Sequence, residues 1–321
     1  MRKILPLVLA SAVLWAGAVL PAATAEILLP PPVSGKDTKL LAIAFKEAER
    51  GRWSSAHRIA ARASDPLGSK ILRWMDFSRP HNYAAFDEIS AFIAANPDWP
   101  RQRRLKAAAE TAMLSISDTD QIRDWFHWRD PVSRDGRLRF ADALIDVGDK
   151  VRAAKFIRLA WVENNFSGKD LKIIHRRYKK FLRPEDHVAR LDRLVWDNRQ
   201  RDARRMFRYV DKGHQALAQA RMALRSFAGG VDAAIDRVPD ELIETAGLMY
   251  ERLRWRRLKG RVEDAREILL DAPEDLGRPK LWWRERAIQA RKTLNRGMVT
   301  DAYRLASEHG QIDSSTFAEA E

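Results

Sequence analysis

A turn residue followed by alanine five positions later occurs five times along this chain. The pairs are Gly51 and Ala56, Gly148 and Ala153, Asn198 and Ala203, Gly260 and Ala265, and Gly297 and Ala302. Gly, and less often Asn, adopts the left-handed conformation that ends a helix. An alanine early in the following helix lets two helices approach closely. The spacing therefore predicts an all-α fold, an α-superhelix (solenoid) of stacked helical hairpins in which each hairpin buries its apolar face on its neighbours.

Helical periodicity of the apolar residues continues between these turns, and no stretch shows sustained strand alternation. Besides the two helices that flank Gly51, helices are predicted over residues 67–77, 83–95, 101–114, 138–147, 151–163, 171–181, 185–196, 203–210, 242–258, 262–270, 281–294 and 300–307. Pro184-Glu185-Asp186 and Pro239-Asp240-Glu241 are interpreted as helix starts, because proline is tolerated in the first turn and acids favour the positive end of the helix dipole. Catalytic carboxylates are the weaker interpretation of these acids.

The first 25 residues have the pattern of a secretory signal peptide. Arg2 and Lys3 precede a mostly apolar run from Ile4 to Leu20, and Ala23-Thr24-Ala25 is a small-x-small cleavage site. The alternative, a membrane anchor, is disfavoured because the apolar run is short and interrupted. Cleavage would place the protein in the periplasm without a transmembrane segment.

The rest of the chain divides into a short linker and one long helical domain. Residues 26–36 contain Pro30-Pro31-Pro32 and are predicted to form an extended Pro-rich linker. Residues 37–321 are predicted to form the α-superhelical domain, long enough to bury a large core. The chain has no cysteine, which excludes disulfides, thiolate metal sites and a cysteine nucleophile.

Basic residues concentrate in one stretch of a chain whose formal net charge is +14. Residues 171–210 contain 13 Lys and Arg against 5 Asp and Glu. This density predicts contact with an anionic polymer, for which Arg176, Arg177, Lys179 and Lys180 are the candidates. A carboxylate-bearing cell-wall polymer or an anionic membrane surface suits an exported protein better than nucleic acid. A solvated face without a specific ligand is the alternative.

Motifs that carry chemistry are not found in the sequence. The seven histidines form no zinc-binding helical pair with a glutamate, and there is no phosphate-binding glycine loop, nucleophile elbow or dinucleotide fingerprint. Asp118 and Asp120 are interpreted as a helix start, and the tryptophans as interior residues between stacked helices, with sugar stacking as the alternative. No catalytic, cofactor-binding or metal-binding residue is assigned, and no cofactor is expected.

Seven stretches of the sequence resemble one known family. They are LRWMDFSRP at 72–80, FIAANPDWPRQ at 92–102, RPEDH at 183–187, RLDRL at 190–194, GLMYERLRW at 247–255, WWRER at 282–286 and FAEAE at 317–321. Together they resemble the N-terminal helical region of soluble lytic murein transglycosylases. The resemblance implies a superhelical ring in the periplasm, which in this family precedes a separate lysozyme-like domain that cleaves the glycan strands of peptidoglycan.

The family's catalytic acid is a glutamate followed by serine, and no Glu-Ser dipeptide occurs in this chain. The resemblance ends before the lysozyme-like domain, so the chain is expected to be a truncated member of the family that binds or positions peptidoglycan and is inactive by itself. The main alternative is a free-standing helical-repeat adaptor that binds other envelope proteins. An active lytic enzyme with an unrecognised site is a weaker third hypothesis.

Overall fold

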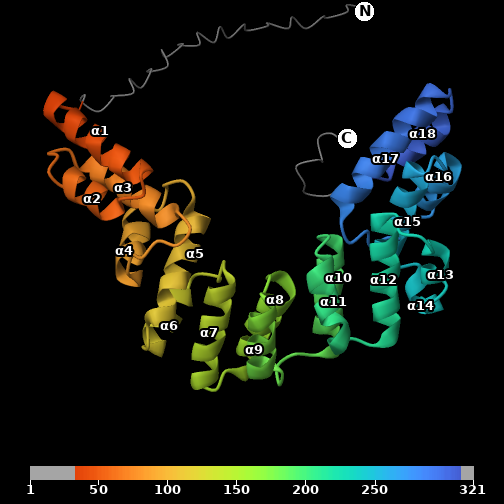
Figure 1. Ribbon diagram of the computed structural model, residues 1–321, viewed down its shortest axis with the longest axis horizontal. Helices are drawn as coiled ribbons and strands as arrows, with labels where there is room; N and C mark the ends of the chain where they lie inside the picture. Colours follow the sequence, from red (N-terminus) through yellow and green to blue (C-terminus); the bar gives the residue numbers. More distant parts are fainter. Residues whose placement is uncertain (1–32, 312–321) are drawn as a thin grey trace, which may run out of the picture. The chain divides into compact units, whose positions relative to one another are not determined.

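The computed structural model describes residues 33–311 and shows an all-α protein in this range, with no β-strand (Figure 1). The predicted all-α class is therefore confirmed. The chain divides into two compact units, with the boundary after Asp76, within the third helix. The first unit contains α1 (Gly35–Glu49), α2 (Trp53–Ala60) and most of α3 (Pro66–Ser78).

The second unit contains the remaining helices that the structure describes. They are α4 (Phe86–Ala95), α5 (Gln102–Ala112), η1 (Met113–Ser115), α6 (Thr119–Phe126), α7 (Arg134–Asp146), α8 (Lys150–Glu163), α9 (Gly168–Tyr178), α10 (Pro184–Trp196), α11 (Gln200–Met206), η2 (Phe207–Tyr209), α12 (Lys212–Ser226), α13 (Val231–Ile235), α14 (Asp240–Ile243), α15 (Ala246–Leu258), α16 (Val262–Leu270), α17 (Pro279–Asn295) and α18 (Val299–Ser307). The elements η1 and η2 are 3₁₀ turns that extend α5 and α11.

The five predicted turns share one backbone conformation. The turn residues have φ of +76° at Gly51, +84° at Gly148, +55° at Asn198, +79° at Gly260 and +79° at Gly297. In each turn the amide of the next residue donates to the carbonyl five residues earlier, with N···O distances of 2.8 to 3.2 Å. This is the hydrogen bond of a Schellman motif, which satisfies a carbonyl that the helix end would otherwise leave unpaired.

The alanine five positions after each turn residue is buried, which confirms the second half of the pattern. Ala56, Ala153, Ala203 and Ala265 are inaccessible to solvent, and Ala302 is nearly so. The paired helices pack side by side: α1 with α2, α7 with α8, α10 with α11, α15 with α16, and α17 with α18. A larger side chain at these positions would hold the two helices apart.

Helices of the second unit also pack on the next pair along the chain. α8 packs on α10, α10 on α12, α12 on α15, and α15 on α17. Tryptophans fill some of these spaces, as predicted: Trp161 and Trp282 are fully buried, each within a hydrophobic cluster that spans several helices. For Trp128 the prediction of an interior position is wrong, because its side chain is 86% exposed. Helix starts are also as expected, since Pro184 opens α10 and the Asp118 carboxylate caps α6.

Several predicted helix boundaries are wrong. The expected helix 242–258 is two helices, because the Thr245 hydroxyl donates to the Leu242 carbonyl at 2.8 Å and the backbone restarts there as α15. The expected helix 203–210 is α11 followed by a 3₁₀ turn, and α4 begins at Phe86, not at residue 83. α12 and α13 were not predicted.

α1 begins at Gly35, inside the expected linker 26–36, because the Ser34 hydroxyl caps it by accepting from the Asp37 amide at 3.1 Å. The expected signal peptide 1–25, the proline run and the last motif at 317–321 lie outside the described residues. In the described part of the chain, no helix combines the length and apolar character that crossing a bilayer requires.

Candidate anion-binding surface on α9 and α11

α9 presents cations along one of its faces. The Ser167 hydroxyl caps its first turn by accepting from the Asp170 amide at 3.1 Å. Lys172, Arg176, Lys179 and Lys180 follow at spacings of four, three and one residues, which places them on one side of the helix and its C-terminal turn. All four side chains are exposed.

The four predicted contact residues do not share one environment. Arg177 forms an ion pair with Asp142 of α7 at 2.9 Å, and Tyr178 donates to the other oxygen of the same carboxylate at 2.9 Å. Tyr178 and Asp142 raise the pKa of Arg177. Among the residues that the structure describes, no carboxylate pairs with Arg176, Lys179 or Lys180. These three residues, and not Arg177, carry the uncompensated charge.

Part of the basic stretch is structural. Arg190 of α10 is only 2% exposed and donates to the Asn164 carbonyl at 2.7 Å and to the Trp161 carbonyl. Arg193, one turn later, reaches the Asn164 carbonyl at 3.2 Å and pairs with Asp197 at 2.9 Å. Neither arginine is available to a ligand. Both arginines are counted in the basic stretch, because composition alone does not reveal which arginines are engaged inside the fold.

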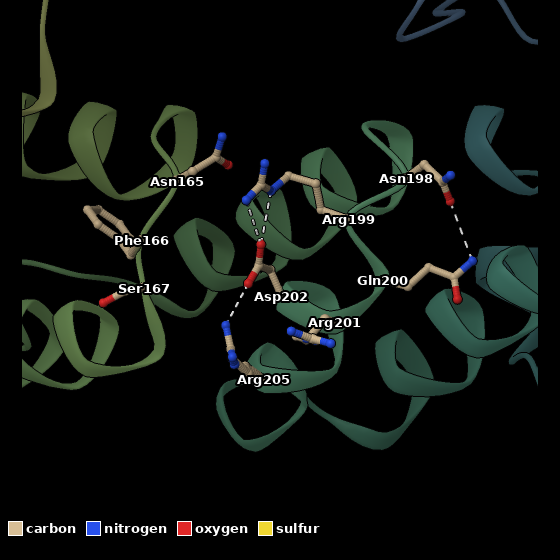
Figure 2. Close-up of a pocket in the computed structure, with 9 residues that line it drawn as sticks. All are labelled: Asn165, Phe166, Ser167, Asn198, Arg199, Gln200, Arg201, Asp202 and Arg205. Carbon is tan, nitrogen blue, oxygen red and sulfur yellow. Dashed lines mark hydrogen bonds and ion pairs between the residues drawn. The ribbon is translucent and has the colours of Figure 1, made fainter. Parts of the chain in front are cut away.

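A shallow, open depression lies between the α8–α9 loop and α11 (Figure 2). It is lined by Asn165, Phe166, Ser167, Asn198, Arg199, Gln200, Arg201, Asp202 and Arg205. Figure 2 shows Asp202 between two arginines, at 2.9 Å from Arg199 and 2.7 Å from Arg205. One carboxylate therefore fixes two guanidinium groups and leaves the depression with a net positive charge.

Three further arginines lie on one face of α11 and the turn after it. Arg201, Arg204 and Arg208 are spaced by three and four residues, and all are exposed. Within residues 33–311 none of them has a carboxylate partner, and Arg204 donates a hydrogen bond to the Gln200 side chain at 3.4 Å. These residues belong to the basic stretch 171–210 but are not among the four predicted contact residues, although their helical spacing is a signal present in the sequence.

The buried carboxylates of this unit serve the fold. Glu110 of α5 accepts from the Val132 and Ser133 amides at 2.8 and 2.7 Å, ahead of α7. Burial raises the pKa of Glu110, and its hydrogen bonds to Ser133 and Val132 oppose this. Glu251 pairs with Arg225, and Glu285 pairs with Arg257. No cluster of three or more potential metal ligands occurs in the part of the chain that the structure describes.

No protein-family model, curated protein or solved structure matches the chain. The family resemblance therefore rests on the seven sequence stretches. Two of them lie close to the basic surface, since RPEDH forms the start of α10 and RLDRL contains the buried Arg190 and the partly buried Arg193. The surface itself consists of exposed guanidinium and ammonium groups, which suit repeated, weak contacts along an anionic polymer.

Proposed function

We propose that this chain is a periplasmic helical-repeat scaffold related to the superhelical region of lytic murein transglycosylases, and that it binds peptidoglycan. The observation that carries the proposal is the group of exposed cations without carboxylate partners among the described residues, Arg176, Lys179 and Lys180, on one side of α9 and its C-terminal turn. The exposed face of α11 supplies three more. Peptidoglycan bears carboxylates at regular intervals, so several weak contacts would add along one strand.

We further propose that these residues position the polymer without cleaving it. Lytic cleavage needs a carboxylic acid that reaches the glycosidic oxygen and transfers a proton. The buried carboxylates Glu110, Glu251 and Glu285 already have structural partners and lie inside the helix packing. Purified protein should accordingly release no anhydromuropeptides from sacculi, and turnover that persists through rigorous purification would contradict this part of the proposal.

Export follows from the proposed signal peptide. Periplasmic material should begin at Glu26, because the basic start, apolar run and cleavage site occur in the expected order. N-terminal sequencing of the fractionated protein tests this, and membrane-bound protein that retains Met1 would contradict it.

The binding proposal is tested with sacculi and a triple charge reversal of Arg176→Glu, Lys179→Glu and Lys180→Glu. Three exposed ion pairs at about 0.5 kcal/mol each correspond to about a tenfold loss of affinity. The fraction of wild-type protein that co-sediments with sacculi should also fall as the salt concentration rises, because exposed charges are screened over about 10 Å at 0.1 M ionic strength.

A matched control separates a local contact from the effect of net charge. Arg103→Glu, Lys150→Glu and Lys155→Glu change the same number of exposed cations on α5 and α8. This control should bind more tightly than the α9 variant. Equal binding of the two variants to sacculi would indicate that the cations on α9 form a solvated surface without a specific ligand.

A free-standing adaptor for envelope proteins is the second candidate, and exposed aromatic side chains favour it. Tyr83 and Trp128 of the second unit are 93% and 86% exposed. Side chains of this kind often anchor protein partners. Cross-linking in the envelope that is lost in Tyr83→Ser or Trp128→Ser, but kept in the α9 charge reversal, would favour the adaptor over polymer binding.

A further inference from the structure

Four aromatic rings meet where α8, α9, α10 and η2 come together. They belong to Trp161, His175, His187 and Tyr209. The His175 ring centroid lies 4.5 Å from that of Tyr209 and 5.6 Å from that of His187. The His187 ring stacks on Tyr209 and meets Trp161 edge-on at 5.3 Å. Two imidazoles are therefore packed as apolar rings within one cluster.

We propose that His175 and His187 form an acid-sensitive lock, which holds α9 against α10 while both imidazoles are neutral and releases it when they are protonated. The lock would regulate the basic surface, because Arg176, Lys179 and Lys180 lie on α9 and its C-terminal turn beside His175. Only this regulatory consequence rests on the proposed function. The lock itself is a property of the free protein.

α9 depends on side chains for its position. Its backbone does not run closely alongside another described helix in the way that the paired helices do. Leu171 and Ile174 pack on the hydrophobic cluster around Trp161, Arg177 and Tyr178 bind Asp142, and His175 contacts the aromatic rings. Loss of the His175 contacts would remove one of these three groups of contacts. The position of α9 is therefore sensitive to the charge of this cluster.

The groups around the two imidazoles make protonation costly. Lys179 on α9 and Arg190 on α10 are cationic neighbours, and Asp186 on α10 is the opposing acid. Tyr209 on η2 and Trp161 on α8 present rings without formal charge. Nδ1 of His187 is buried and has no hydrogen-bond partner in the described part of the chain. Protonation of either imidazole would add a positive charge to this cluster, where neither water nor a carboxylate fully compensates it.

Burial, reinforced by Lys179, lowers the pKa of His175. Burial, reinforced by His175 and Arg190 and opposed by Asp186, lowers the pKa of His187. A histidine in the released segment has its ordinary pKa of about 6.5. The released state therefore binds protons more readily, and the docked state keeps its full stability above about pH 6.5 and loses it as the pH falls further.

The test is hydrogen exchange of the amides of residues 168–182 at pH 7.5 and 5.0, each compared with intrinsic rates at the same pH. Wild type should lose protection about tenfold at pH 5.0 in this segment, with a smaller change in α12 and α15. The double variant His175→Gln and His187→Gln should show no such pH dependence. His214→Gln is the control, since His214 pairs with Asp211 at 2.6 Å outside the cluster.

Protection that is the same at both pH values in wild type would overturn the lock, as would a double variant that responds to pH like wild type. If the double variant does not fold, histidine C2-proton titration of wild type decides. The two resonances are assigned with the single variants His175→Phe and His187→Phe or by sequential assignment. Titration of both histidines with a pKa clearly below 6.5 supports the lock. Titration of both with a pKa at or above 6.5 refutes it. Sacculus binding at pH 7.5 tests the proposed function separately, so each idea can fail alone.

Discussion

The guanidinium of Arg190 on α10 lies over the indole of Trp161 on α8, 5.1 Å from the ring centroid, and donates to the Trp161 carbonyl. The same relationship recurs one step along the chain. Arg221 of α12 lies 4.9 Å from the Trp196 ring centroid, and Arg225, one turn later, donates to the Trp196 carbonyl at 2.9 Å. Arginines of α10 thus cover the C-terminal end of α8, and arginines of α12 cover that of α10, where carbonyls lack intrahelical partners.

This arrangement predicts that replacement of Arg190 by lysine lowers the stability of the fold. Arg190→Lys should lower the free energy of unfolding by about 2 kcal/mol, because an ammonium group cannot stack on Trp161 and reach two carbonyls together. Burial lowers the pKa of Arg190 to about 9, so the guanidinium remains charged at pH 7. Urea denaturation at pH 7 measures the loss. Arg201→Lys on exposed α11 is the control and should change stability by less than about 0.5 kcal/mol.

The turn between α7 and α8 predicts a cost for any side chain at Gly148. Its φ is +84°, which a residue with a Cβ adopts only with backbone strain, so Gly148→Ala should destabilise the second unit by about 1 kcal/mol. A steric clash would not contribute, because a Cβ at this position would meet no atom within 4 Å. Gly229 has equally open surroundings but no positive φ, so Gly229→Ala is the matched control and should be neutral or slightly stabilising. Equal urea midpoints for the two variants would contradict the conformational argument.

The alanine of the repeat predicts a steric cost. Ala203 is completely buried within the cluster around Trp161. Ala203→Leu should destabilise by about 1 to 3 kcal/mol, because the added carbons must push α11 away from α10. Ala189→Leu adds the same atoms at an exposed position of α10 and should be close to neutral. Thermal melts of both variants give the comparison. An Ala203→Leu variant as stable as wild type would show that the close approach is not required.

The buried carboxylate of Glu110 predicts a loss of stability through an unsatisfied hydrogen-bond donor. Its carboxylate accepts from two backbone amides, and the amide group of Gln offers only one oxygen acceptor. Glu110→Gln should therefore lower the free energy of unfolding by about 1 to 3 kcal/mol, since one buried donor loses its partner. Glu267→Gln on the exposed face of α16 makes the same chemical change without a buried partner. Indistinguishable urea curves for the two variants would exclude this role.

The helices and the five turns could be predicted from the sequence because the interactions that decide them are local. At each of the five turns a glycine or asparagine in the left-handed region ends a helix, and apolar periodicity marks the buried face. Boundaries failed where a side chain acts on its own backbone, as Thr245 does between α14 and α15. The candidate surface was only partly predictable, since the sequence showed a dense basic stretch but not which of its members are paired.

The helical hairpin, with its left-handed turn residue and its buried alanine, could be predicted from the sequence, since both depend on a backbone conformation and a side-chain size encoded within six residues. Which arginines are paired or buried depends on how the helices pack. Arg190 and Arg193 bind carbonyls at the end of α8, and Arg177 is paired with Asp142, whereas Arg176 and Lys179 have no carboxylate partner among the described residues. Asp142 is 35 residues from Arg177, and Asn164 is 26 residues from Arg190, so these partners are brought close only when successive helices pack.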